Sequence, residues 1–155
     1  MKKSLLSLLL CLSLCCSGCS ATQVKDRLYL QSLELSNYRY PTVQLHAFQS
    51  EEADCSGSGS TLSAALESAE IPAGKSLFLG HLELLALQEP KFLQQLPDVM
   101  QTYRLSSGCK LLYTTRSLAE VNTETLLESL KQEEQNGRIP ETGLLSILKE
   151  RCNSS

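Results

Sequence analysis

Alternating apolar and polar residues mark two strands in the first third of the chain. A strand repeats every two residues, so alternate side chains line one face. The apolar positions are Leu28, Leu30, Leu33 and Leu35 in the first run, then Val43, Leu45 and Ala47 in the second. Asn37 and Pro41 between the runs indicate a turn. The pattern predicts strands over 28–35 and 43–49, with His46 on the solvated side of the second strand.

A segment rich in glycine, serine and acidic residues follows these strands. Residues 50–60, SEEADCSGSGS, predict a mobile connector, because the full GxGxxG spacing and the lysine of a phosphate-binding loop are both missing. Apolar side chains then recur on one helical face at Leu62, Ala65, Leu66 and Ala69. Ser60 or Thr61 can cap this helix, and Pro72 and Gly74 end it.

The stretch SLFLGHLELLAL, residues 76–87, is almost wholly apolar. It predicts a buried strand pair, or one strand broken at Gly80. Helical spacing resumes over 92–103, where Pro97 predicts two short helices or a kink near Leu96, because proline removes a backbone donor.

The last third of the chain predicts a strand over 109–115, a helix from Thr123 to about Asn136 and a weak final helix, GLLSILKE. Asn122 can cap the longer helix and Gly137 can end it. The expected fold class is α/β (α+β), a small mixed sheet packed by two or three helices, within a single domain. The helices near 61–70 and 91–104 would cover the sheet.

The start of the chain has the pattern of an export leader. Two lysines precede an uncharged apolar run over residues 5–16, which is shorter than the roughly 20 apolar residues needed to cross a bilayer. Ser and Gly then stand before Cys19. This ending resembles the bacterial lipobox, although Cys16 occupies the position where leucine is usual. The resemblance implies cleavage before Cys19 and a diacylglyceryl group on its thiol. The alternative is an ordinary secreted protein cut nearby, after Ala21.

Length and net charge limit the classes of function that the chain can have. Removal of residues 1–18 leaves 137 residues, with 12 basic and 17 acidic side chains and a net charge of −5. A mildly acidic surface argues against nucleic acid as a partner. It also offers no polybasic patch for anionic lipid, so attachment to a membrane would come from the acyl chains, of which two suffice for stable anchoring.

The cysteines and the acidic pairs give little support for catalysis or metal binding. Glu51 and Glu52 lie in a loop, and Glu133 and Glu134 lie on a polar helix face, where adjacent side chains do not face one another, so the second pair is predicted to be solvated. Cys55, Cys109 and Cys152 follow the leader without a CxxC motif, so no zinc site is predicted. A disulfide between Cys55 and Cys109 is one possibility, and three thiols are the other. Two histidines and no GxSxG motif argue against a nucleophilic site, and we expect no enzyme activity and no cofactor.

Two motifs resemble a known family. The stretch T-L-x-x-A-L at 61–66 follows a glycine-rich loop, and K-x-L-F-L-G-H follows at 75–81. With the lipobox cysteine and the early strand pair, this order is similar to the amino-terminal domain of the Ger(x)C spore germination lipoproteins, the C subunits of germinant receptors. The resemblance covers roughly residues 16–120. Family members carry two further domains, and this chain ends where the second would begin.

The resemblance implies a division into a leader (1–18), a lipidated tether (19–27), a Ger(x)C-like domain (28–121) and a helical extension with a polar tail (122–155). It implies a structural role for Gly80 and His81: a sharp bend with unusual backbone angles at Gly80 and an imidazole hydrogen-bonded to a carbonyl or carboxylate. The implied function is non-catalytic, in receptor assembly or germination.

The implied location is the outer face of the cell membrane or of the spore inner membrane, beside integral-membrane receptor subunits. The alternative function is a lipid-anchored solute-binding protein of the cell envelope, with a pocket beside Gly80 and His81.

Overall fold

The fold is built around one long central strand. The computed structural model describes residues 26–48 and 54–153. The strands are β1 (Arg27–Ser36), β2 (Thr42–Ala47), β3 (Cys55–Ser58), β4 (Ser76–Phe78), β5 (Leu84–Leu87) and β6 (Lys110–Tyr113). They form one six-stranded sheet in the order β3-β2-β1-β5-β6, with β4 paired to the first residues of β1. The predicted mixed sheet in a single domain is confirmed.

Strand direction divides the sheet into two halves. β2 and β3 are antiparallel to their neighbours, as expected for strands joined by short connections. β4, β5 and β6 all run parallel to β1 or to each other. The predicted strand pair over 76–87 is therefore real, but its two strands do not pair with each other. Both lie against β1, in succession along its length.

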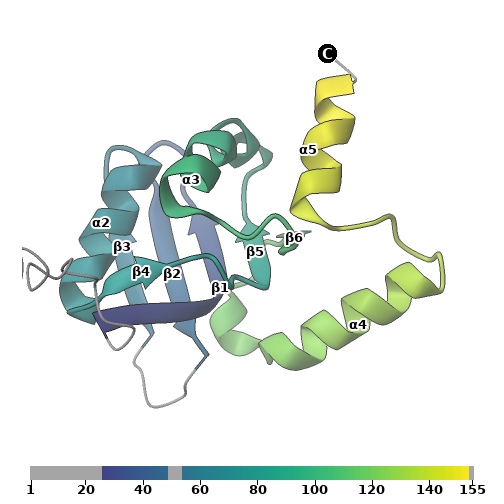
Figure 1. Cartoon of the computed structure of the whole chain (residues 1–155), viewed down its shortest axis with the longest axis horizontal. Helices are drawn as coiled ribbons and strands as arrows, with labels where there is room; N and C mark the ends of the chain where they lie inside the picture. Colours follow the sequence, from purple (N-terminus) through teal and green to yellow (C-terminus); the bar gives the residue numbers. More distant parts are fainter. Residues whose placement is uncertain (1–25, 49–53, 154–155) are drawn as a thin grey trace, which may run out of the picture.

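Helices cover one face of the sheet, which we call the leucine face. They are α2 (Leu62–Ala73), the short 3-10 helix η2 (Pro90–Gln94) and α3 (Leu96–Tyr103). Figure 1 shows α2 and α3 on the same side of the strands. The core there joins the leucines of β1 to Val43 and Leu45 of β2 and to Leu66, Phe92 and Val99 of the helices. The predicted break near Leu96 is confirmed.

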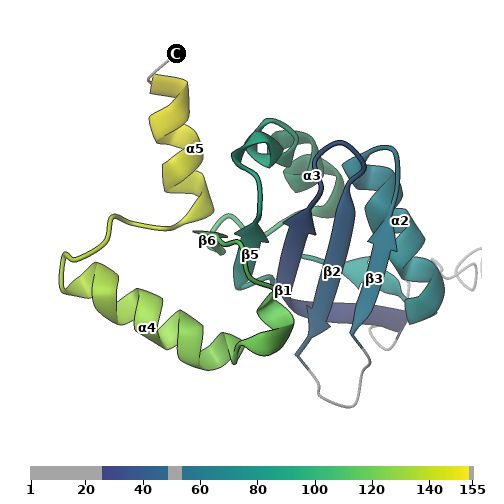
Figure 2. The same cartoon turned by 180° about the vertical axis from the view of Figure 1, so that it is seen from behind.

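The opposite face, which we call the polar face, carries Ser32, Glu34, Gln44 and His46 along β1 and β2. Figure 2 shows no helix over β2 and β3 on this side. Its β5 end is covered by the 3-10 helix η3 (Leu118–Glu120) and by α4 (Thr123–Gln135). A second, smaller core forms there from Leu84, Ala86, Leu118 and Leu127.

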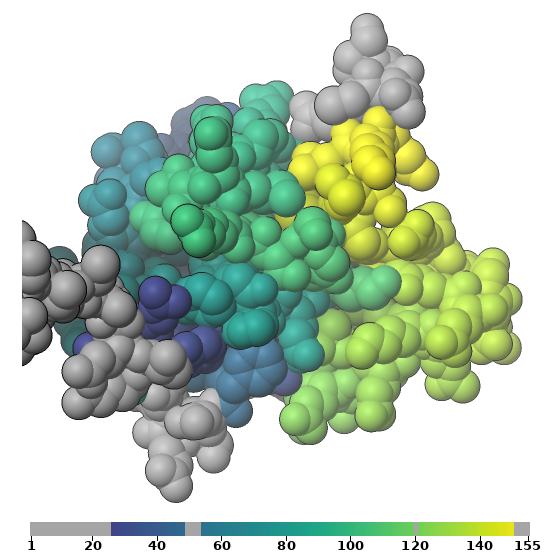
Figure 3. All heavy atoms as spheres, in the orientation of Figure 1, coloured from purple at the N-terminus to yellow at the C-terminus, as the bar shows by residue number. Residues whose placement is uncertain are grey.

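The carboxy-terminal helices lie to one side of the sheet. α4 is followed by α5 (Leu144–Asn153), and Figure 3 shows the carboxy-terminal part of the chain, in yellow-green and yellow, on one side of the molecule. α4 is capped by Asn122, whose side chain accepts from Thr125 N, as predicted. A short bridge between Gly143 and Lys110 brings the chain back to the edge of β6, and Leu144 is fully buried. No helix within the described ranges is long and apolar enough to cross a bilayer.

The predicted connector over 50–60 is wrong at its second half, since residues 55–58 form β3. Gly57 explains the difference. A Cβ atom there would lie 2.3 Å from Ala65 O and 2.6 Å from Ala69 N. The backbone of α2 thus rests directly on β3, and glycine permits this close approach. α2 is capped by Thr61 as predicted, but it continues through Pro72 and ends before Gly74, which is left-handed at φ 61°.

Substitution of Gly57 tests this contact. We expect Gly57→Ala to lower the free energy of unfolding by about 1–3 kcal/mol, because the new methyl group forces α2 away from β3. Urea denaturation measures the change. Gly108→Ala is the matched control, since a Cβ there meets only Ser106 Oγ at 3.9 Å. An effect of equal size at both positions would contradict the contact.

Candidate functional site

Gly80 and His81 lie in the connection between β4 and β5. This corner is at the end of the sheet where β1, β5 and β6 begin, the amino edge. The backbone turns there through a hydrogen bond from Leu82 N to Leu79 O, at 3.1 Å. Leu79 O also accepts from Ser106 N, so the connection between α3 and β6 packs beside the corner. Residues from two connections therefore meet at this edge.

Glycine is required at position 80 because a side chain has no space there, and not because the backbone angles are unusual. Its φ is not among the positive values, which among described glycines occur at Gly74 and Gly137. A Cβ atom at Gly80 would lie 2.7 Å from Cζ of Phe78. The prediction of unusual dihedrals at Gly80 is therefore wrong. Glycine is needed there because the Phe78 ring folds back over it and occupies the space of a side chain.

His81 stacks on aromatic rings. Its ring centroid lies 6.1 Å from Tyr29 and 5.3 Å from Phe78. The guanidinium of Arg27 lies over the ring of Phe78, 5.2 Å from its centroid. We call Arg27, Tyr29, Phe78 and His81 the aromatic cluster. The imidazole hydrogen bond predicted for His81 is not found among the described residues, and the exposed ring is held by stacking instead.

A shallow hollow opens beside His81. Its volume is about 260 Å³, and Glu83, Lys110 and Lys131 are among the residues that line it. The hollow lies between the amino edge of the sheet and α4. If the protein were a lipid-anchored solute-binding protein, as the alternative hypothesis has it, the solute would bind in this hollow. Its charges are of both signs, which gives no clear preference for a cation or an anion.

Glu134 of α4 anchors the helical extension to β6. One carboxylate oxygen accepts from Lys110 Nζ at 2.6 Å, and the other accepts from Thr142 N at 2.6 Å and from Thr142 Oγ1. Burial by itself would raise the pKa of this carboxyl, but the hydrogen bonds from Lys110 and Thr142 lower it to about 2. The sequence pattern predicts a solvated charge at Glu134, and this prediction is wrong.

A second acid is buried on the polar face. Glu34 is 3% exposed and accepts from Gln88 Nε2 at 2.7 Å, Ser117 Oγ at 3.0 Å and Leu118 N at 2.9 Å. Nothing in the alternation of β1 distinguishes this glutamate from a solvated one. Its burial depends on η3, which is far away in the sequence.

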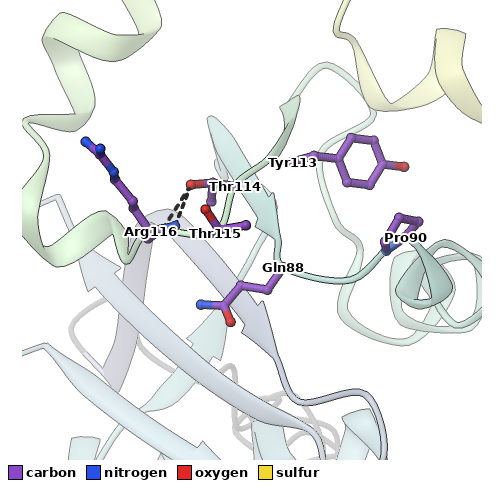
Figure 4. A pocket seen from close by; sticks show the side chains of 6 residues that line it. All are labelled: Gln88, Pro90, Tyr113, Thr114, Thr115 and Arg116. Atoms are coloured by element: carbon purple, nitrogen blue, oxygen red, sulfur yellow. Dashed lines mark hydrogen bonds between the residues drawn. The ribbon is translucent and has the colours of Figure 1, made fainter.

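A larger hollow lies at the carboxyl ends of β5 and β6. It measures about 490 Å³ and is lined by Gln88, Pro90, Tyr113 and the segment 114–116. Parallel sheets commonly bind ligands at this edge. Figure 4 shows Arg116 and Tyr113 pointing to opposite sides, away from Gln88. The polar groups therefore do not converge on one point, as they do in a specific ligand pocket.

Ser32 of β1, His46 of β2 and Asp54, which directly precedes β3, lie next to one another across the sheet. His46 Nδ1 lies 2.8 Å from Asp54 Oδ2, and its side chain is only 12% exposed, so the prediction of a solvated histidine is wrong. Ser32 pairs with His46 in the sheet. However, Ser32 Oγ and His46 Nε2 are both buried without a hydrogen-bond partner in the described ranges. The serine–histidine contact that activates a nucleophile is not made.

The cysteines form no bridge within the described residues. Cys55 lies on β3 and Cys109 just before β6, at opposite edges of the sheet. Four strand spacings of about 4.8 Å separate them, far beyond the roughly 7 Å limit for a disulfide. The predicted bridge is wrong. Burial raises the pKa of the Cys109 thiol to about 12, which makes it unreactive at neutral pH. The side chain of Cys152 and all of Cys19 lie outside the described residues.

No protein-family model, no curated protein and no solved structure matches this chain. Among the described residues, no group of three His, Cys, Asp or Glu side chains is arranged as metal ligands. The assignment of function therefore depends on the chain's own residues.

Removal of the His81 ring tests the stacking. We expect His81→Ala to leave the protein folded and to lower the free energy of unfolding by about 0.5–1 kcal/mol, the usual contribution of one aromatic contact. His81→Phe should recover most of this loss, because a ring is restored without a hydrogen-bonding group. If the phenylalanine variant were as unstable as the alanine variant, a polar role of the imidazole would replace stacking.

The low pKa of Glu134 makes its contribution depend on pH. Because the folded pKa of about 2 lies below the ordinary value of 4.5, the stabilisation is complete above pH 4.5 and is lost as the pH falls toward 2. We expect Glu134→Gln to cost about 1–2 kcal/mol at pH 7 and progressively less below pH 4.5. Urea denaturation at several pH values measures this.

The neighbouring Glu133→Gln is the control. Glu133 pairs with Arg138 at 3.0 Å, but both side chains are more than one third exposed, so its loss should change stability by less than about 0.5 kcal/mol. Equal costs for the two variants at pH 7 would contradict a specific anchor at Glu134.

Proposed function

We propose that this protein is a non-catalytic lipoprotein that is anchored through a diacylglyceryl group on Cys19 and acts in the assembly of a spore germinant receptor. The observation that carries the proposal is the apolar leader that ends in Ser-Gly-Cys19, eight residues before β1 begins at Arg27. A tether this short holds the domain at the surface of the membrane. Confinement raises its effective concentration for integral-membrane receptor subunits.

The placement of the two motifs supports the family resemblance. Thr61 of T-L-x-x-A-L caps α2, and K-x-L-F-L-G-H forms β4 and the corner at Gly80. Glu70 of α2 accepts a hydrogen bond from Leu77 N at 2.9 Å. The two stretches that resemble the Ger(x)C family therefore belong to one packed unit. Their side chains stabilise a fold, which agrees with a role in assembly.

The second candidate is a lipid-anchored solute-binding protein. The hollow of about 260 Å³ beside Gly80 and His81 favours it, and so does the larger hollow at the carboxyl edge. Neither gathers several polar groups around one point. Retention of a solute by the purified protein would favour this candidate over the first.

Replacement of the lipid-bearing cysteine tests the proposed function. In cells that produce the full chain, we expect the wild-type protein to sediment with membranes and its amino-terminal peptide to carry a diacylglyceryl mass. Cys19→Ala should remove this mass and should move the protein to the soluble fraction once the membranes are washed with high salt, because no acyl chain remains and salt screens any contact between basic side chains and anionic lipid. Cys11→Ala is the matched control, because Cys11 lies in the apolar run before the lipobox, and it should leave both results unchanged.

The same pair of strains tests the partner. Detergent-solubilised membranes should yield integral-membrane receptor subunits together with the wild-type protein, and these should be lost with Cys19→Ala. An unmodified Cys19 thiol, or a Cys19→Ala variant that still sediments with membranes washed with high salt, would overturn the anchor. A lipidated protein that recovers no membrane subunit would overturn the role in assembly.

A further inference from the structure

A third hollow lies at the amino edge, where Arg27 and Phe78 of the aromatic cluster line it. Its volume is about 360 Å³, and Arg27, Ser76, Thr102, Tyr103 and Arg104 contribute to its lining. Phe78 separates it from the corner at Gly80. We call it the arginine hollow. Two arginines and three hydroxyl-bearing residues line it, and no acidic residue is among its lining residues.

Within the part of the chain that the structure describes, neither arginine of the hollow is paired with an acid. Arg27 lies over the ring of Phe78 at 5.2 Å. Arg104 follows α3 and is left-handed at φ 52°, a conformation that few residues other than glycine adopt. Neither guanidinium makes an ion pair with any residue that the structure describes, whereas Arg138 and Lys110 elsewhere do.

Two acids of α2 act on Tyr103, which lines the hollow. Glu67 and Glu70 are close enough to raise the pKa of Tyr103, after burial, which is the largest cause. Glu70 is already engaged by Leu77 N, and neither acid lines the hollow. The Tyr103 hydroxyl therefore stays protonated at neutral pH and can donate a hydrogen bond. The donors of this hollow suit an oxyanion, and the fork of an arginine matches two phosphate oxygens.

The position of the hollow indicates where such a phosphate comes from. Cys19 is eight residues from Arg27, and eight residues span at most about 28 Å. If Cys19 is lipidated as proposed above, the hollow is kept within this distance of the phosphate groups of the membrane. The mature chain is acidic overall, so a basic concavity at this end is not a consequence of general charge.

We infer that the arginine hollow binds the phosphate of an anionic membrane lipid, with Arg27 and Arg104 as its main donors, and so orients the domain with its amino edge against the bilayer. This inference rests on the proposed lipid anchor for the position of the membrane. The phosphate chemistry itself rests on the hollow alone.

Vesicle binding without the acyl chains tests the inference. The mature chain 19–155 with Cys19→Ser contains every described residue and carries no lipid. We expect it to float with vesicles of phosphatidylcholine and phosphatidylglycerol and not with phosphatidylcholine alone. A basic side chain near an anionic surface contributes about fivefold in affinity, so Arg27→Gln/Arg104→Gln should weaken binding about 25-fold.

Two further variants control for charge and folding. Arg39→Gln/Arg116→Gln removes the same charge from the other end of the sheet and should bind as the parent does. Thr102→Glu places an acid at the exposed rim of the hollow and should abolish binding without loss of either arginine. Circular dichroism checks that each variant is folded.

Each outcome decides the inference. Equal losses in the two arginine double variants would mean general charge attraction and would overturn the site. An absence of vesicle binding by the parent chain would also overturn the site, and so would a Thr102→Glu variant that binds vesicles as tightly as the parent. Titration with inorganic phosphate separates the sources: tight binding of phosphate without vesicle binding would overturn the membrane lipid. An unmodified Cys19 in cells would overturn the anchor, yet leave the vesicle result standing.

Discussion

The register of β1 is the constraint on which the rest of the structure depends. This strand pairs with β2 on one side and with β4 and then β5 on the other. Its Leu33 and Leu35 point to the leucine face, while Ser32 and Glu34 point to the polar face. A slip of one residue would exchange the two sets. It would place a carboxylate in the core under α2 and α3 and remove the acceptor that holds η3.

Two hydrogen-bonded carboxylates fix α4, one near each end of this helix. Glu34 receives donors from the segment just before α4, and Glu134 near the end of α4 receives donors from Lys110 and Thr142. A carboxylate removed from water is costly unless hydrogen bonds satisfy it. Each acid has three, so the helix between them is positioned from the sheet by polar contacts as well as by Leu127. This explains how a helix with a narrow apolar stripe keeps a fixed place.

The sequence predicts the elements that local chemistry determines. Thr61 and Asn122 as helix caps, the break before Pro97 and the leucine alternation of β1 all follow from residues a few positions apart. β3 is not predicted, because CSGS has no strand pattern of its own. It becomes a strand because β2 offers a paired edge and α2 rests on Gly57. The parallel pairing of β4 and β5 with β1 is not predicted either, since the same apolar run fits either arrangement.

The residues of the candidate site also divide into those that the sequence singles out and those that only the fold brings together. His81 and Gly80 stand out because they interrupt an apolar run, but their partners Tyr29 and Phe78 have no signal in the sequence. Arg27 and Arg104 are 77 positions apart, and an exposed arginine after a helix is usually solvated. Only the fold brings both to one hollow. Glu34 has no signal for a related reason, because its burial is produced by a segment more than eighty residues later.

The two ends of the sheet differ in a way that bears on orientation. All parallel strands begin at the amino edge, where the aromatic cluster and both arginines of the hollow lie, and the proposed anchor enters β1 at that edge. The carboxyl edge, with Gln88 and Arg116, is at the far end of the same strands. An anchor eight residues before β1 can reach the bilayer with the amino edge facing it. The carboxyl edge and the turn at Asn37 then point away from the membrane. A partner embedded in the bilayer would therefore contact the amino edge, the edge at which the hollow beside Gly80 and His81 also lies. A solute in the larger hollow at the carboxyl edge would bind on the side away from the membrane.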